Sequence, residues 1–147
     1  MTPPGPENVS KERAIVVAEQ PEKSMEQVIR EDGRYPQEAF QFLHEALAAA
    51  VKEIYGEDVE AGGPMHVSGE KLCHALRDLA IQKWGLLART VLAKWNIRST
   101  MDVGNMVYLL VQHDFMKKSE EDSIEHFRDV FDFDEAFKIG GEFELKE

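Results

Sequence analysis

Cysteine is almost absent from this chain, since Cys73 is the only one in 147 residues. A single cysteine excludes a disulfide within the chain and also a cysteine-rich zinc site. No stretch approaches the roughly 20 apolar residues that a membrane span needs. The start of the chain is rich in proline and lacks the basic beginning and apolar run of a signal peptide. The sequence therefore predicts a cytoplasmic protein with no membrane association.

Positive charge is also scarce, because 17 Lys and Arg residues stand against 28 Asp and Glu residues, which gives a net charge of -11. Such a chain repels phosphate backbones at long range, which disfavours general nucleic-acid binding. The charge is unevenly distributed: residues 69–98 carry six bases and two acids, whereas residues 119–147 carry eleven acids and three bases. We expect the acidic end to fold near the basic helices and to offset their charge.

Signatures of catalysis are missing as well. The chain has no His-Glu-x-x-His pattern, no phosphate-binding Walker loop and no dinucleotide fingerprint. No serine lies in the glycine pattern of a nucleophile elbow. The five histidines form no recognisable ligand set, so no metal, cofactor or catalytic residue is predicted. These absences favour a non-enzymatic role and leave an enzyme open as the alternative.

Apolar residues make up 43% of the chain and recur mainly at helical spacing. The clearest stripe includes Phe40, Leu43 and Leu47, which share one face of an expected helix. Ser68 is suited to begin a later helix as its N-cap, and Asn96 can end another in the left-handed conformation. Helices are predicted over residues 24–32, 36–55, 69–83, 86–95, 100–112 and 119–131, with a final helical turn near 134–138.

These segments predict a mainly α fold, a compact bundle of five or six helices in one domain over residues 24–138. Residues 1–23 and the acidic residues 139–147 are expected to be flexible. The three helices between residues 69 and 112 follow the order of a winged-helix domain, with a minor β-hairpin expected near residues 115–133. The third of these helices carries no Lys or Arg, so we predict that its face does not read DNA.

The stretch His66-Val67-Ser68-Gly69-Glu70 is the most distinctive candidate for binding chemistry. Ser68 and the N–H groups after it would lie at a helix N-terminus, where a small anion can bind. Interpreted as structure alone, Ser68 simply caps its helix. Ligand binding would require a concave pocket on which Arg89 or Asp102 converges. The candidate ligand-binding or partner-binding residues are His66, Ser68, Glu70, Arg89, Trp95 and Asp102.

Six short motifs follow one another over about 100 residues: Arg34-Tyr35-Pro36 with Ala39-Phe40, His66-Val67-Ser68-Gly69-Glu70, Ala88-Arg89-Thr90-Val91-Leu92, Trp95-Asn96-Ile97, Thr100-Met101-Asp102-Val103-Gly104, and Phe131-Asp132-Phe133 with Ala136-Phe137. In this order they resemble an uncharacterised bacterial family, the Minf-type hypothetical proteins. The chain departs from the family pattern at Asn96, where a glycine is expected, and in a longer loop over residues 56–64. Asn96 tolerates the same left-handed geometry. The resemblance implies no established activity, cofactor or catalytic residue.

Three functional hypotheses remain. The first is a non-catalytic interaction or regulatory module that binds a protein partner, because no catalytic signature is present. The second is association with nucleic acid or the ribosome through a basic strip, with the acidic end as a displaceable cover. The third is an enzyme or small-ligand binder that uses the helix N-terminus at Ser68. The basic strip consists of Lys71, Arg77, Lys83, Lys94 and Arg98, with Arg89 among them.

Overall fold

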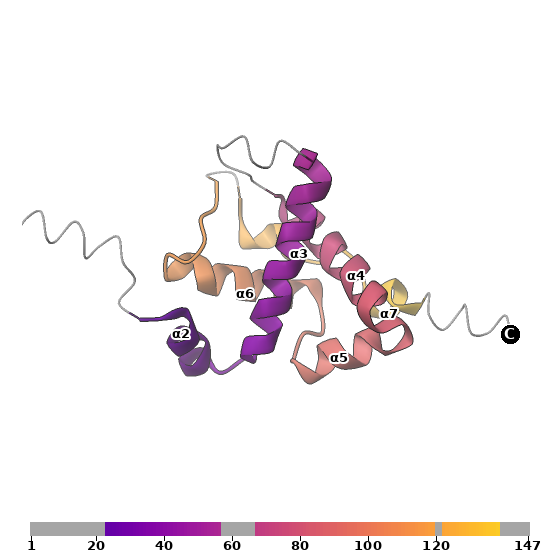
Figure 1. The fold of residues 1–147 in the computed structure, drawn as a ribbon, viewed down its shortest axis with the longest axis horizontal. Coiled ribbons are helices and arrows are strands. Elements are labelled where there is room, and N and C mark those ends of the chain that lie inside the picture. Colours follow the sequence, from indigo (N-terminus) through magenta and orange to yellow (C-terminus); the bar gives the residue numbers. More distant parts are fainter. Residues whose placement is uncertain (1–22, 57–66, 120–121, 139–147) are drawn as a thin grey trace, which may run out of the picture.

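The structure is a computed structural model that describes residues 23–56, 67–119 and 122–138. Every regular element in these residues is helical, which confirms the predicted mainly α bundle (Figure 1). The elements are, in chain order, α2 (Met25–Asp32), α3 (Gln37–Tyr55), α4 (Gly69–Trp84), the 3-10 helix η2 (Gly85–Leu87), α5 (Ala88–Lys94), α6 (Thr100–Gln112), the 3-10 helix η3 (Ile124–Phe127) and α7 (Phe133–Ala136).

Local sequence signals set the ends of these helices. The hydroxyl of Ser68 accepts a hydrogen bond from the Lys71 N–H at 3.1 Å, which confirms Ser68 as the N-cap of α4. Asp102 in the first turn of α6 accepts a hydrogen bond from the Ser99 N–H at 3.1 Å. Asn96 follows α5 with a φ of 68°, the left-handed conformation predicted for it.

The core forms where α3 packs along α4 and where α4 in turn contacts α5 and α6. In Figure 1, α3 crosses the middle of the molecule between α6 and α4. Leu43, Leu76, Met106 and Leu110 are at most 1% exposed. Burial of one side chain of this size stabilises the fold by about 1.5–3 kcal/mol. Much of α6 is buried, as expected for a helix that is apolar on most of its sides.

The segment after α6 differs from the prediction. The sequence predicts a helix over residues 119–131 and a minor hairpin near residues 115–133, and both predictions are wrong. The structure instead has the single turn of η3, begun by the Ser123 hydroxyl, which accepts a hydrogen bond from the Glu125 N–H at 3.1 Å. A turn with a φ of 51° at Asp129 follows, and the described residues of this segment contain no strand.

Contacts with α6 explain this difference. The buried Thr100 hydroxyl donates a hydrogen bond to the Phe127 carbonyl at 2.6 Å and accepts one from the Val130 N–H at 3.2 Å. Both bonds join residues that lie far apart in the sequence, so helical spacing alone could not reveal them. With no strand after α6 in the described residues and with α6 itself buried, the likeness to a winged-helix domain ends at the order of the three helices.

The predicted domain limits overlap only partly with the described residues. Of the segments 1–23 and 139–147, for which flexibility is predicted, only Lys23 is described. The helical turn predicted near residues 134–138 is present as α7. None of the helices in the described part of the chain has the length and apolar composition that crossing a lipid bilayer requires.

Cys73 provides a chemical probe of the core. Its side chain is 0% exposed, and burial raises the pKa of its thiol to about 12. Because the thiolate is the reactive form, we expect the native chain at neutral pH to react with a thiol reagent at least about 100-fold more slowly than the urea-unfolded chain. Mass spectrometry of timed labelling reactions measures both rates. Similar rates for the two states would show that α4 is not packed as described.

Candidate functional site

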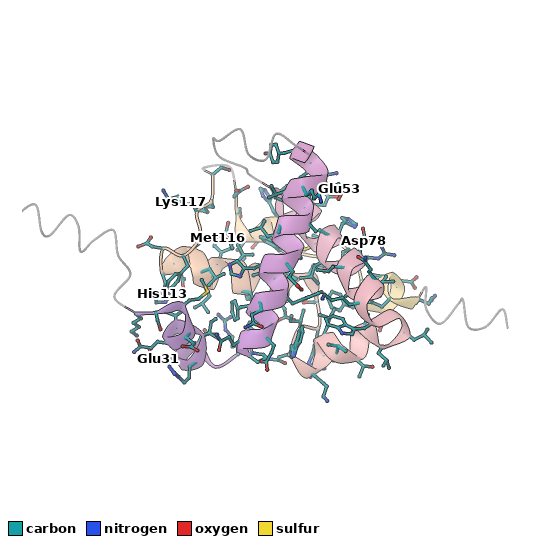
Figure 2. All side chains as sticks on the ribbon, in the orientation of Figure 1. Glu31, Glu53, Asp78, His113, Met116 and Lys117 are labelled. Carbon is teal, nitrogen blue, oxygen red and sulfur yellow. The ribbon has the colours of Figure 1, made fainter. Side chains whose placement is uncertain are left out.

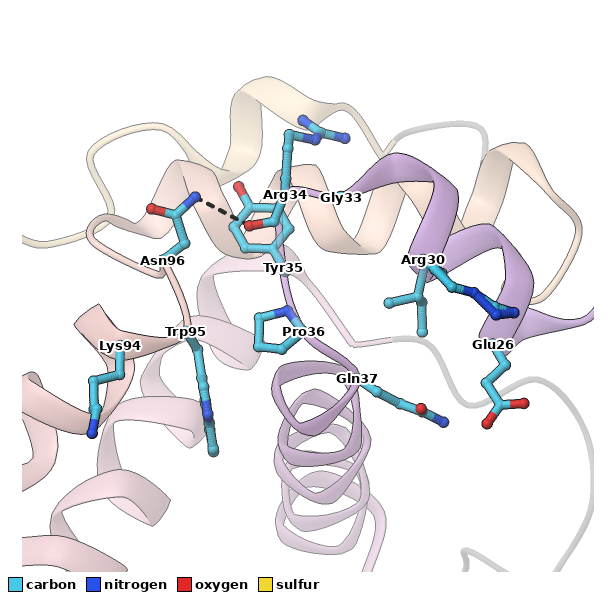
Figure 3. Close-up of a pocket in the computed structure, with 11 residues that line it drawn as sticks. Glu26, Arg30, Gly33, Arg34, Tyr35, Pro36, Gln37, Lys94, Trp95 and Asn96 are labelled. Atoms are coloured by element: carbon cyan, nitrogen blue, oxygen red, sulfur yellow. Dashed lines mark hydrogen bonds between the residues drawn. The ribbon is translucent and has the colours of Figure 1, made fainter.

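An open groove of about 650 Å³ lies between the end of α2, the start of α3 and the end of α5. We call it the α2–α5 groove. Figure 3 shows Lys94, Trp95 and Asn96 on one side and Arg30 and Glu26 on the other, with the start of α3 between them. Its walls are formed by Glu26, Ile29, Arg30, Gly33, Arg34, Tyr35, Pro36, Gln37, Lys94, Trp95 and Asn96.

The short link between α2 and α3 shapes the floor of the groove. Gly33 ends α2 with a φ of 78°, a conformation that glycine adopts without strain, and it turns the chain toward α3. Tyr35 follows and is 4% exposed, so it anchors the link in the core. Pro36 then serves as the N-cap residue of α3. The fixed φ of proline makes this entry into the helix rigid.

A polar network below the groove ties α2, α3 and α6 together. The Tyr35 hydroxyl donates a hydrogen bond to Asp102 Oδ1 at 2.6 Å and accepts one from Asn105 Nδ2 at 3.3 Å. The second carboxylate oxygen of Asp102 accepts hydrogen bonds from the N–H groups of Arg98 at 2.8 Å and Ser99 at 3.1 Å. Asp102 is therefore engaged in structure on both of its oxygens.

The α5 side of the groove is held by aromatic packing and one direct bond. The indole of Trp95 packs against Phe42 and Trp84, with ring centroids 5.8 Å and 5.5 Å apart. Asn96 Nδ2 donates a hydrogen bond to the carbonyl of Arg34 at 3.1 Å, which joins the two sides of the groove (Figure 3). Trp95 is half-buried, so it presents an apolar face while remaining fixed in place.

The rim of the groove is basic. Arg34 pairs with Asp32 at 3.0 Å, and its guanidinium lies 5.6 Å from the centre of the Tyr35 ring. The exposed Arg30 and Lys94 form no ion pair with any described residue. The only carboxylate in the lining is Glu26. The lining of the groove thus holds more basic than acidic side chains, on a strongly acidic chain.

The Tyr35 phenol gives the network a predicted pH dependence. Burial, reinforced by the hydrogen bond to Asp102, raises the pKa of Tyr35 from 10.0 to about 12. Between these values the unfolded chain loses the phenolic proton first, so the free energy of unfolding falls as the pH rises, by up to about 1.4 kcal/mol per pH unit from this group. Urea unfolding at about pH 9, 10 and 11 measures the free energy of unfolding at each pH. With rising pH this free energy should fall less steeply for Tyr35→Phe than for the unaltered chain. Equal slopes for the two proteins would contradict it.

The residues proposed from the sequence as one ligand site lie in separate places. Ser68 caps α4, Asp102 belongs to the Tyr35 network, and Arg89 pairs with Asp134 at 2.5 Å. Glu70 is exposed in the first turn of α4, and only Trp95 lines the α2–α5 groove. His66 lies outside the described residues. The convergence that the small-ligand hypothesis requires at Ser68 is therefore not found among the described residues.

The basic strip is divided by acidic partners. Arg77 pairs with Asp78 at 2.7 Å and donates to the Ala136 carbonyl at 3.3 Å. Lys83 lies 3.5 Å from Glu45. Asp78 and Glu45 lie in α4 and α3, so among these contacts only the pairing of Arg89 with Asp134 and the bond from Arg77 to the Ala136 carbonyl join the acidic end to the basic helices. The other three strip cations, Lys71, Lys94 and Arg98, are exposed, and their side chains have no acidic partner among the described residues.

This division leads to a prediction about nucleic acids. We expect RNA and DNA to bind with dissociation constants no tighter than about 100 µM at physiological salt, because three of the six strip cations already face acids and the chain is acidic overall. Fluorescence polarisation between roughly 50 and 200 mM salt measures this. Asp134→Asn, which releases Arg89, is the variant in which any weak binding should increase. Binding tighter than about 100 µM at physiological salt would contradict the prediction.

Sequence reasoning missed Arg30, Tyr35 and Gln37 as groove residues. The available signal was a helix-ending glycine followed closely by Pro36, which marks a tight turn between two helices.

Comparison with protein-family models, with curated proteins and with solved structures found no match. Within residues 23–56, 67–119 and 122–138, no three His, Cys, Asp or Glu side chains are grouped to hold a metal ion.

Proposed function

We propose that this domain is a non-catalytic interaction module that binds a short acidic segment of a protein partner in the α2–α5 groove. The observation that carries the proposal is the combination of two uncommitted cations, Arg30 and Lys94, with the half-buried Trp95 in one groove. Cations flanking an aromatic face provide both charge attraction and apolar contact for an extended segment.

Electrostatic range favours a short acidic segment over a long polyanion. At physiological salt, charges separated by more than about 8 Å are largely screened. A short segment in the groove responds mainly to the side chains that line it. There Arg30 and Lys94 outnumber Glu26, whereas the charge of Arg34 is offset by Asp32. A long nucleic acid would also meet the remaining surface of a chain with a net charge of -11.

The rigidity of the groove also supports a binding role. The Tyr35 network and the bond from Asn96 to Arg34 hold its floor and sides in place before any partner arrives. A preorganised surface loses less conformational entropy when it binds. The size of the groove suits a few residues of a partner, which is typical of a weak and reversible interaction.

The polar groups of the groove support binding better than catalysis. Acid–base chemistry needs a titratable group placed to exchange a proton with a substrate, and nucleophilic catalysis needs a nucleophile beside a base. Glu26 is exposed at the rim, and Asp102 is engaged by the Tyr35 hydroxyl and two backbone N–H groups. The lining contains no Ser, Thr, Cys or His.

Charge reversal tests the proposal. The double variant Arg30→Glu with Lys94→Glu should lose partners that the unaltered protein captures from an extract of its own cells under mild salt. Lys52→Glu with Lys71→Glu changes the net charge equally at exposed positions outside the groove and should retain them. We expect the affinity for a captured partner to fall at least about tenfold in the groove variant. Identical capture by both variants, or no partner at all, would refute the proposal.

A further inference from the structure

A second cavity, of about 160 Å³, lies apart from the groove and shares none of its lining residues. It is bounded by α3, the first turn of α4, α6 and described residues within 116–118 and 122–127, and we call it the α4–α6 cavity. Figure 2 marks Met116 and Lys117 in the chain that follows α6. Its walls are formed by Leu47, Val67, Gly69, Leu72, Val107, Tyr108, Met116, Lys117, Lys118, Asp122, Ser123, His126 and Phe127.

Apolar side chains form most of the inner wall. Leu47, Leu72, Val107 and Phe127 come from four different elements, so the cavity lies at a junction of the fold. Cavities of about 150 Å³ lined by aliphatic and aromatic side chains accept molecules the size of benzene. Met116 adds a flexible, polarizable wall that can adjust to an occupant.

Tyr108 is one of the wall residues, and it carries an unsatisfied polar group. Its hydroxyl oxygen is buried and has no hydrogen-bond partner among the residues that the structure describes. Buried polar groups without a partner are rare in folded proteins, because leaving one unpaired destabilises the fold by about 1–3 kcal/mol. Burial, together with the charge of Asp122, raises the pKa of Tyr108, so the phenol keeps its proton and remains a donor.

The polar groups at the edge of the cavity fall into two sets. Lys118 donates to the carbonyls of Ser119 at 3.2 Å and Asp122 at 3.3 Å, and the Asp122 carboxylate accepts from the Ser119 N–H at 3.0 Å. These bonds hold the turn itself, and Asp122 is the single acidic side chain among the described lining residues. The side chains of Lys117 and His126 make no hydrogen bond or ion pair with described residues. Together with Tyr108, the uncommitted groups can all donate a hydrogen bond.

We propose that the α4–α6 cavity binds a small molecule with a hydrocarbon body and a carboxylate head. The body fills the apolar space between Leu72, Val107 and Phe127. The carboxylate accepts hydrogen bonds from Tyr108 and Lys117, which gives the buried phenol the partner that it lacks. This site is independent of the α2–α5 groove, so a partner in the groove is neither required nor excluded by it.

Titration with benzoate, followed by amide chemical shifts of the full chain, tests this proposal. We expect saturable shifts at Gly69, Leu72 and Val107 with a dissociation constant of about 1 mM or below. Benzylamine has the same ring with the opposite charge and should bind at least about tenfold more weakly. Lys117→Ala should weaken benzoate binding about threefold or more, whereas the exposed control Lys71→Ala should not.

Tyr108→Phe separates a ligand role from a purely structural one. Removal of an unsatisfied hydroxyl should raise the melting temperature of the free protein while it weakens benzoate binding. A higher melting temperature with unchanged binding would show that the hydroxyl has no part in a site. The proposal also fails if no saturable shifts appear up to roughly 10 mM benzoate, or if benzylamine binds as tightly as benzoate.

Discussion

Replacement of Gly104 by alanine is expected to destabilise the fold by about 2–3 kcal/mol, although alanine is the better helix former by about 1 kcal/mol. A Cβ atom at Gly104 would lie 2.8 Å from Cβ and Cγ of Phe127. Such contacts cannot be relieved by rotation of the ring, because Phe127 Cβ is attached directly to the backbone of η3. The backbone of η3 would have to move away from α6, which would disturb the bonds at Thr100.

Urea unfolding of Gly104→Ala measures this effect, and two further variants calibrate it. A Cβ at Gly69 would meet only the tip of the Phe127 ring, at 3.0–3.2 Å. The ring tip can shift slightly, so Gly69→Ala should destabilise the chain by about 1 kcal/mol. Gln112→Ala, at an exposed position of α6, should change stability by less than about 0.5 kcal/mol. A stabilised Gly104→Ala variant would show that η3 is not packed against α6 as described.

Thr100→Val should destabilise the fold by about 2–4 kcal/mol while keeping nearly the same side-chain shape. Thr100 is 1% exposed, and its hydroxyl satisfies both the Phe127 carbonyl and the Val130 N–H. Valine leaves both of these backbone groups without that partner. An unpaired buried group of this kind destabilises a fold by about 1–3 kcal/mol.

Two comparisons isolate the hydroxyl of Thr100. Thr100→Ser keeps the donor and acceptor and should lose only about 1 kcal/mol. Thr90→Val makes the same chemical change at an exposed position and should have an effect within about 0.5 kcal/mol. The measurement is the free energy of unfolding of each variant. If Thr100→Val and Thr90→Val have equal effects, the bonds to the segment after α6 do not stabilise the fold.

Helices whose ends and faces are encoded locally could be predicted from the sequence. Phe40 and Leu43 define the buried stripe of α3, Ser68 caps α4, and Asn96 ends the α5 region. Each of these features depends on residues within one or two turns of each other. Helical periodicity and capping preferences act over that distance, so a single sequence contains them.

The rest of the structure depends on contacts between residues that lie far apart in the sequence. η3 is fixed by Thr100 and by the space left at Gly104, which no local pattern near Phe127 reveals. The α2–α5 groove is lined by Tyr35, which bonds to Asp102, 67 residues later in the chain. Tyr35 follows an arginine and precedes a proline, so its burial has no periodic signal. Charge counting located a basic region but could not show that Arg77 and Arg89 are paired.

Photo-crosslinking in cells tests the proposed role of the α2–α5 groove most directly. A photoreactive residue at Gln37, in the exposed floor of the groove, should crosslink a partner upon illumination. The same residue at Glu53, exposed near the other end of α3 and marked in Figure 2, provides the matched control. We predict a crosslinked protein from position 37 that is absent from position 53 and is lost upon reversal of Arg30 and Lys94. Equal crosslinking from both positions, or none from position 37, would contradict the groove as the binding surface.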